Sequence, residues 1–246
     1  LKNAVTKKPF LGFSDTTLNH FMLHKVGLPT FYGQAFLPDV CELAPEMLPY
    51  TKRYFEEFLK TGTIREVRPS ELWYTSRTDF SPEALGTELP AHKNTGFELL
   101  QGPAQFDGEI LGGCIDSMYE MFSGWRYGDM PEVCRNYGLF PSMDDWLGKI
   151  LLMESCEEYM PPETYKKALE TLQETGVFDA VSGVLVGKPM DDMYHEEYKK
   201  LLVETISNKE LPILCNINVG HAQPRCILPF GVPAHVDADA QVIRFG

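Results

Sequence analysis

The short segment Gly12-Phe13-Ser14-Asp15-Thr16 contains the residue best placed for chemistry. An apolar run leads into the glycine, and apolar residues at helical spacing follow. We therefore expect Ser14 on a tight turn between a strand and a helix, where backbone N–H groups and the helix N-terminus stabilise negative charge. Serine acyl-transfer enzymes hold their nucleophile on such a turn. The alternative is that Ser14 is a helix N-cap and that Asp15 complements the helix dipole.

Two other polar residues follow predicted strands. His221 comes after the apolar run 212–219, and Glu154 comes after the run 150–153. In open α/β sheets, side chains at the carboxyl ends of strands line the ligand crevice. A carboxylate there can accept the Nδ1 hydrogen of a histidine, which in turn can take a proton from a serine. The chain order of serine, glutamate and histidine is that of the α/β-hydrolases.

These residues also have simpler interpretations. His221 can be a loop histidine with local hydrogen bonds, and Glu154 can belong to an acidic loop with Glu157 and Glu158. Of these acids, we expect Glu157 and Glu158 to be solvated because they lie further from the strand. The coincidence of three strand-end positions, with Ser14, favours the triad.

Other clusters indicate chemistry more weakly. His20 and His24 lie one helical turn apart, but the residue after His20 is not glutamate, so the metalloprotease pattern fails. Asp191 and Asp192 with His195 are more typical of a solvated helix start. The six cysteines include no C-x-x-C pair, which indicates reduced thiols in a cytoplasmic protein. We expect no metal ion.

Composition excludes several classes of partner. The 246 residues carry a net charge of −13, which argues against a nucleic-acid polymer because backbone binding needs clustered lysine and arginine. No apolar stretch approaches the roughly 20 residues that span a bilayer, so we expect no membrane partner. The first residues have no apolar signal-peptide region, which again favours the cytoplasm.

Strand and helix patterns alternate along the chain, which predicts an α/β fold. Residues 64–108 interrupt the alternation, because they are rich in Pro, Gly, Thr, Ser and charge, and are predicted to be a linker or a long functional loop. A strand then meets Gly112-Gly113, which we expect to turn into a helix. Residues 124–147 are predicted to be irregular.

Five short motifs are spread along nearly the whole chain. They are the Ser14 turn, the segment 108–114 (GEILGGC), the strand 150–154 (ILLME), the strand 183–187 (GVLVG), and the histidine segment 220–224 (GHAQP) followed by 228–231 (LPFG). In this order they resemble the LD-carboxypeptidase and microcin-immunity serine peptidases. Several motifs in the right order are more specific than any one of them.

The resemblance implies Ser14 as nucleophile, Glu154 as triad acid and His221 as general base. It implies an N-terminal parallel, Rossmann-like α/β domain, here incomplete, over residues 1–65. A C-terminal swivelling-type domain of mixed β structure and helices would follow over 66–246, with a long substrate loop at 66–107. The site would lie between the domains of a cytoplasmic homodimer that needs no cofactor.

Within the family, the long stretch at 64–108 favours the microcin-immunity branch, whose substrates are small peptidyl or aminoacyl nucleotides. In that branch an aromatic side chain from this region stacks on a nucleobase, and Trp73 and Phe80 are the candidates. Both can instead be ordinary packing aromatics. The alternative substrate is a murein tetrapeptide with an L,D bond. An alternative of another class is a binding protein that does not cleave its ligand, and a third is a zinc hydrolase.

One departure from the family concerns the oxyanion hole. Family members carry a long segment before the nucleophile, including a Gly-Gly turn that supplies an oxyanion N–H, whereas thirteen residues precede Ser14 here. The donor that the sequence does contain is the N–H of Asp15. Loss of one donor typically costs about 10²–10³ in rate. We expect the sequence to be an N-terminally shortened copy of a longer protein.

Overall fold

Four parallel strands form the centre of the computed structural model, which describes residues 8–246. They are β7 (Gln105–Cys114), β8 (Ile150–Glu154), β9 (Gly183–Gly187) and β10 (Ile213–Ile217). Their residues read as continuous apolar runs because both faces of these strands are covered. All five residues of β8 are buried, as are those of β9 and β10.

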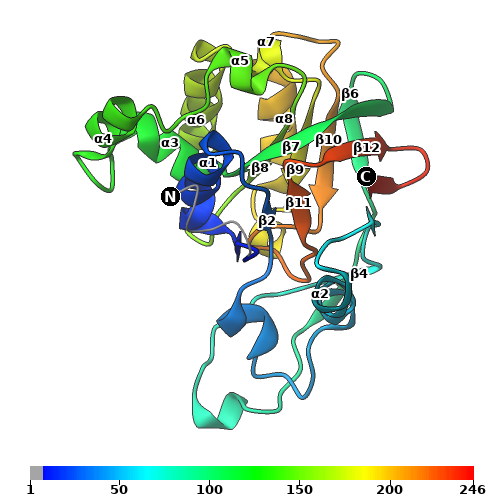
Figure 1. Ribbon diagram of the computed structural model, residues 1–246. Coiled ribbons are helices and arrows are strands. Elements are labelled where there is room, and N and C mark those ends of the chain that lie inside the picture. Colours follow the sequence, from blue (N-terminus) through cyan, green and yellow to red (C-terminus); the bar gives the residue numbers. More distant parts are fainter. Residues whose placement is uncertain (1–7) are drawn as a thin grey trace.

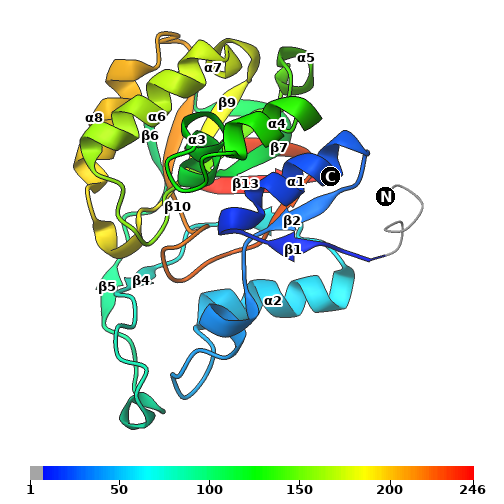
Figure 2. The ribbon, with the colours of Figure 1, turned by 90° about the vertical axis from the view of Figure 1, so that its left-hand side faces the viewer.

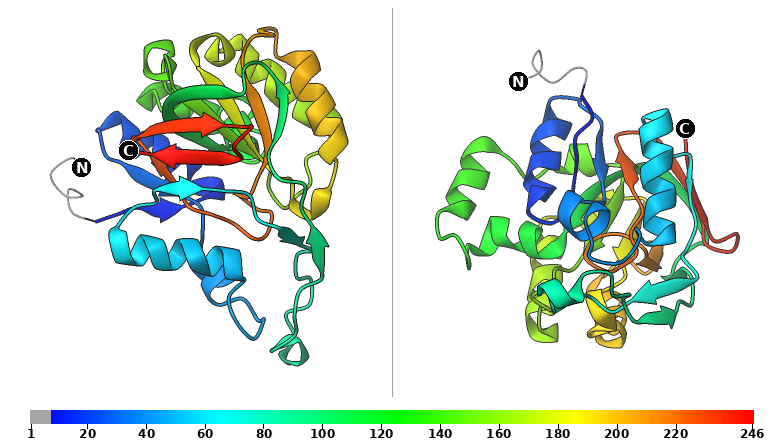
Figure 3. Two further views of the ribbon diagram at one scale, coloured as in Figure 1. Left: turned by 90° about the vertical axis from the view of Figure 1, so that its right-hand side faces the viewer. Right: turned by 90° about the horizontal axis from the view of Figure 1, so that it is seen from below.

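Antiparallel strands extend this sheet on both sides. The order of the eight strands is β3-β13-β12-β7-β8-β9-β10-β6. The added strands are β3 (Glu66–Val67), β6 (Glu98–Gln101), β12 (Pro233–Asp237) and β13 (Val242–Phe245). Figure 3 shows β12 and β13 as a red pair beside the short cyan strand β3. The α/β fold predicted from the alternation of strands and helices is confirmed.

Helices cover one face of the parallel strands, as Figure 2 shows for α3, α6 and α8. The helix α6 buries Tyr165, Ala168, Leu169 and Leu172, which is the spacing of a single apolar face. The prediction that residues 124–147 are irregular was wrong, because two short helices lie there. The bounds of these helices are α3 (Ile115–Ser123), α4 (Met130–Tyr137), α5 (Met143–Trp146), α6 (Pro162–Glu174), α7 (Val177–Ala180) and α8 (His195–Thr205).

A smaller sheet combines two strands from near the start of the described chain with one strand from near its end. The strands β1 (Leu11–Gly12) and β2 (Thr30–Tyr32) are parallel, and β11 (Leu228–Phe230) pairs antiparallel with β2. The helix α1 (Thr17–Lys25) connects β1 to β2 and packs against β7. Figure 1 shows α1 and β2 in blue beside the red C-terminal strands. The N-terminal part is thus a parallel α/β unit, and the division at residue 65 stays a prediction.

The segment expected to be a linker or loop contains strands of its own. The strands β4 (Leu72–Tyr74) and β5 (Ala91–Lys93) form a two-stranded sheet that carries the 3-10 helix η3 (Pro82–Ala84) away from the body (Figure 3). We call residues 72–93 the arm. Its base is anchored, because the N–H of Tyr74 donates to the carbonyl of Gln223 at 2.9 Å. The helix α2 (Pro49–Thr61) lies near the same end of the molecule (Figure 1). None of the helices within residues 8–246 is long and apolar enough to cross a bilayer.

Gly112 and Gly113 lie inside β7 and do not form the turn that the sequence analysis predicted. Gly112 has φ +137, and a Cβ built there would lie 2.1 Å from the carbonyl oxygen of Leu152 on β8. Glycine is therefore required where β7 and β8 approach most closely. The strand continues through both glycines to Cys114 before α3 begins.

We expect Gly112→Ala to lower the free energy of unfolding by about 1–3 kcal/mol or more, because its Cβ meets backbone atoms of β8. Urea unfolding followed by circular dichroism measures the change. Gly128→Ala is the matched control, because a Cβ at Gly128 meets nothing within 4 Å. Equal stability of the two variants would contradict this packing argument.

Candidate active site

Ser14 lies on the strand-turn-helix that its sequence context predicts. It follows β1 and begins the 3-10 helix η1 (Ser14–Thr16), which leads directly into α1. Its φ of +61 lies in the left-handed region, which is strained for a residue other than glycine. The N-cap interpretation was wrong, because the N-cap of η1 is Phe13 and the N-cap of α1 is Thr16. The strained turn instead directs the Ser14 hydroxyl toward His221.

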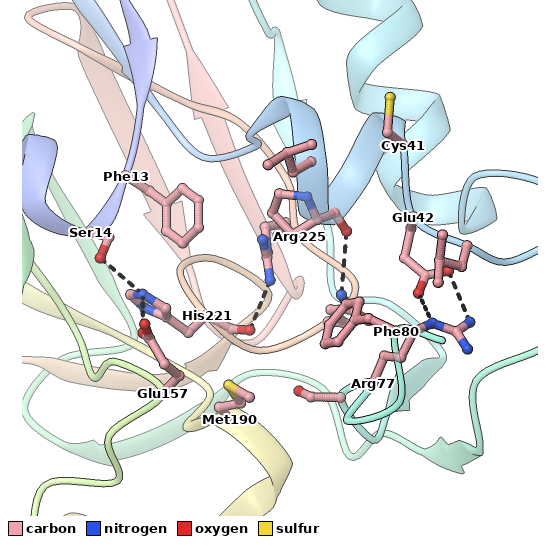
Figure 4. Close-up of a pocket in the computed structure, with 15 residues that line it drawn as sticks. Phe13, Ser14, Cys41, Glu42, Arg77, Phe80, Glu157, Met190, His221 and Arg225 are labelled. Atoms are coloured by element: carbon pink, nitrogen blue, oxygen red, sulfur yellow. Dashed lines mark hydrogen bonds and ion pairs between the residues drawn. The ribbon is translucent and has the colours of Figure 1, made fainter. Parts of the chain in front are cut away.

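A continuous hydrogen-bonded chain joins the three residues that the sequence analysis singled out. Ser14 Oγ lies 3.0 Å from Nε2 of His221, and Nδ1 of His221 lies 2.7 Å from Oε2 of Glu154. Figure 4 shows Ser14 pointing at the imidazole. Glu154 is buried at the carboxyl end of β8, and His221 is buried in the loop after β10. This is the geometry of a nucleophile, a base and a residue that orients the base.

Two features hold Glu154 in position. Its Oε1 accepts a hydrogen bond of 2.6 Å from the hydroxyl of Tyr32, and its Oε2 accepts one of 3.2 Å from the backbone N–H of His221. Gly220 has φ +87, and a Cβ there would lie 2.3 Å from Oε2 of Glu154. The glycine before the histidine therefore lets the loop approach the carboxylate closely.

Tyr32 was missed by the sequence analysis. Its hydroxyl accepts a hydrogen bond of 3.0 Å from the N–H of Ser14 while donating to Glu154, so it links the Ser14 turn to this carboxylate. Burial and the nearby charge of Glu154 raise the pKa of this phenol well above its usual value. No motif in the sequence pointed to Tyr32, which is the last residue of the short strand β2. The parallel pairing of β1 and β2 brings it to the site.

The imidazole of His221 is held between two carboxylates. Oε2 of Glu157 lies 3.0 Å from Nε2, on the opposite side of the ring from Glu154. Burial lowers the pKa of His221, but the charge of Glu154 and hydrogen bonds to Glu154 and Glu157 outweigh it and raise the pKa to about 10. The hydrogen bond to His221 lowers the pKa of Glu157 to about 2.

Glu157 and Glu158 are largely exposed, as expected, but both also have charged partners. Glu157 pairs with His221, and Oε2 of Glu158 lies 2.7 Å from Nη2 of Arg126. Asp191 was also expected to be solvated, but it accepts hydrogen bonds from the N–H of Ser76 and the hydroxyl of Tyr159.

Other packing fixes the ring of His221. The ring of Phe13 meets it edge to face at 4.9 Å, and the guanidinium of Arg225 lies 4.9 Å from the Phe13 ring. Arg225 also donates to the carbonyl of His221 and pairs with the buried Asp39. The loop that carries the histidine is therefore tied to the segment after β2.

A pocket of about 640 Å³ opens beside Ser14 and His221. The arm contributes Ser76, Arg77 and Phe80 to its lining, and the segment after β2 contributes five residues. The guanidinium of Arg77 pairs with Glu42, and both side chains are buried. Figure 4 shows this pair beside Phe80, across the pocket from Ser14. The lining consists of Phe13, Ser14, Leu37, Pro38, Cys41, Glu42, Leu43, Ser76, Arg77, Phe80, Glu157, Met190, His221, Gln223 and Arg225.

The two aromatic candidates of the arm differ in position. Phe80 is 74% exposed and lines the pocket. Trp73 is not in the lining and stacks on His92 at 4.1 Å, with the ammonium of Lys188 4.9 Å from its ring.

Asp15, the predicted oxyanion donor, is the first residue after Ser14. Its N–H lies in the first turn of η1, where backbone donors have no intrahelical acceptor. Its carboxylate lies 3.7 Å from Arg126, so the side chain turns toward that guanidinium.

Metal-binding residue types occur at two places. His20 is buried, and both of its ring nitrogens have hydrogen-bond partners, Thr30 and the carbonyl of Gly12, so the ring does not share a metal with His24. Burial also lowers the pKa of His20 to about 4. Donor atoms of Cys114, Glu154 and His221 lie within 4.8 Å of one another. The carboxylate and imidazole of that cluster are already hydrogen-bonded to each other and to Tyr32.

Comparisons with known proteins agree with this architecture. The sequence profile of the LD-carboxypeptidase C-terminal domain matches residues 107–236. The microcin C7 self-immunity protein MccF of Escherichia coli is 26% identical over 238 residues, which are 94% of this chain and 63% of that protein. The chain thus spans less than two thirds of the length of that relative.

Two solved structures are similar. The MccF-like protein from Streptococcus pneumoniae, in complex with AMP, is 57% identical with a TM-score of 0.98, and the match covers 100% of this chain and 71% of that one. MccF in complex with aspartyl sulfamoyl adenosine has a TM-score of 0.76 at 23% identity, over 100% of this chain and 70% of that one, which supports the fold alone. The chain therefore belongs to the LD-carboxypeptidase family of peptidases, to which the order of its motifs had pointed.

Proposed function

We propose that this protein is a serine peptidase of the microcin-immunity type, which hydrolyses the amide bond of a small aminoacyl or peptidyl nucleotide. The observation that carries the proposal is the hydrogen-bonded chain from Ser14 through His221 to Glu154 at the wall of a pocket. A binding protein without catalysis has no need of a serine hydroxyl 3.0 Å from a buried imidazole. The distance therefore favours hydrolysis over binding alone.

In the proposed reaction, Nε2 of neutral His221 takes the hydroxyl proton of Ser14 as the oxygen attacks the scissile carbonyl carbon. Glu154 stabilises the imidazolium that forms, and the N–H of Asp15 donates to the carbonyl oxygen as it becomes negative. The imidazolium then gives its proton to the leaving nitrogen, and an acyl-enzyme remains. Water attacks this ester with His221 again as base, which frees the acid and regenerates Ser14.

The nucleotide part of the proposal rests on a relative and on the pocket. AMP is bound by the Streptococcus pneumoniae protein that is 57% identical to this chain. The pocket here has the volume of small-molecule sites and an exposed aromatic ring, that of Phe80, in its wall. A murein tetrapeptide with an L,D bond is the alternative substrate. Hydrolysis assays of the full-length protein with an aminoacyl nucleotide and with a murein tetrapeptide distinguish the two substrates. The homodimer and the cytoplasmic location stay predictions.

We expect Ser14→Ala to reduce kcat by about 10³- to 10⁶-fold, because the variant has no nucleophile. Release of the nucleotide from an aminoacyl-nucleotide substrate measures the rate. Ser123→Ala, which removes an exposed hydroxyl at the end of α3, is the control and keeps full activity. Full activity of Ser14→Ala would end the triad proposal.

We expect Tyr32→Phe to lower kcat/KM by about 10- to 100-fold, because loss of a donor to a buried acceptor costs about 1–3 kcal/mol. Tyr50→Phe is a matched control, since it removes a hydroxyl that donates to the carbonyl of Arg68, away from Ser14. If both variants lose the same activity, the effect is general destabilisation and not a role of Tyr32 at the site.

We expect Phe80→Ala to raise the Kd for AMP by about 5- to 150-fold, the effect of losing one base-stacking aromatic. Isothermal titration calorimetry measures the change, with Leu85→Ala as a control of similar exposure in the same arm. A loss of affinity in Trp73→Ala and none in Phe80→Ala would transfer the stacking role to Trp73.

A further inference from the structure

The turn after β8 carries an acid whose contact with the base conflicts with catalysis. Oε2 of Glu157 and Oγ of Ser14 both lie 3.0 Å from Nε2 of His221. This nitrogen carries at most one hydrogen, so it cannot donate to Glu157 and accept from Ser14 at the same time. The contact with Glu157 therefore holds the ring in the protonated form, which is not a base.

Glu157 differs from the acids around it in its partners. Arg126 pairs with Glu158 at 2.7 Å and with Asp15 at 3.7 Å. In the described part of the chain, His221 is the single cation paired with Glu157. The side chain of Glu157 is 60% exposed and belongs to the pocket wall, so a ligand can reach it.

The charges near this pair come from several elements. Glu154 attracts the proton of His221, whereas Arg225 repels it. Arg126 faces Glu157 from the segment after α3 and lowers the pKa of its carboxyl. The other titratable neighbours include Asp15, Glu158, Tyr159, Tyr32 and Cys114.

We propose that Glu157 is a specificity residue that binds a substrate ammonium group next to the scissile carbonyl, and that this exchange frees Nε2 of His221 to accept the Ser14 proton. The inference rests on the proposed role of His221 as general base. When the ammonium replaces the imidazolium as partner of Glu157, the Nε2 hydrogen leaves as a proton to water. Neutral His221 then has its lone pair directed at Ser14. One positive charge, the ammonium, has entered the site and one, the proton, has left it.

The geometry selects the kind of substrate. Since Ser14 Oγ and Glu157 Oε2 share one neighbour at 3.0 Å, they are no more than twice that distance apart. A group bound to Glu157 while Ser14 attacks is therefore close to the carbonyl, as the α-ammonium of an aminoacyl group is. An acylated amino group has no charge and leaves the contact between Glu157 and His221 in place. The site thus favours aminoacyl over N-acylated, peptidyl substrates.

The first test measures the protonation of His221, directly by NMR and through the pH dependence of the reaction. NMR titration of the His221 ring in the full-length protein compares the wild type with Glu157→Gln and with the control Glu158→Gln. We expect Glu157→Gln to lower the pKa of His221 by about one unit or more, and Glu158→Gln to change it far less. The acid limb of kcat/KM, which reports deprotonation of the base, moves to lower pH in Glu157→Gln. An unchanged pKa in Glu157→Gln overturns the inference.

The second test uses alanyl sulfamoyl adenosine and its N-acetyl derivative as calorimetric probes. We expect the free amine to bind about tenfold tighter or better and to release a proton to the buffer. Glu157→Gln removes both effects, and Glu158→Gln keeps them. Equal affinities in the wild type, or a preference that survives in Glu157→Gln, overturn the inference. The hydrolase proposal is tested separately, by Ser14→Ala.

Discussion

The buried carboxylate of Glu154 is the point on which the site depends. It accepts hydrogen bonds from Tyr32, which is 122 residues away in sequence, and from the backbone and ring of His221, which is 67 residues away. A buried carboxylate is costly unless it is paired and hydrogen-bonded. The small N-terminal sheet, the end of β8 and the histidine loop must therefore all be in place to supply the hydrogen-bond partners of this carboxylate.

The remaining charges of the pocket are arranged as neutral pairs. Arg77 pairs with Glu42 and Arg225 pairs with Asp39, and all four side chains are buried. These ion pairs connect the arm and the histidine loop to the segment after β2. Because they cancel, the electrostatics beside Ser14 depend mainly on the histidine and the two acids that flank it. The protein thus separates the charges that shape the pocket from those that we propose to take part in the chemistry.

Sequence reasoning singled out three residues that the structure brings together, because local context was enough to recognise them. Ser14, Glu154 and His221 each follow an apolar strand, and the carboxyl ends of such strands meet at one edge of a fold. Tyr32 and Glu157 could not be found in this way, because their contacts depend on which strands pair and how a turn folds back. Gly112 was misinterpreted for the same reason, since only its pairing with β8 requires a glycine inside a strand.

The pairing of β11 with β2 has a consequence for the order of folding. The strand that holds Tyr32 is made well before its antiparallel neighbour, which is formed by residues 228–230, shortly after the histidine. Contacts between such distant segments close late, because the long intervening loop must first be ordered. A nascent chain can therefore pair the strand that holds Tyr32 on both of its edges only after residues 228–230 have left the exit tunnel.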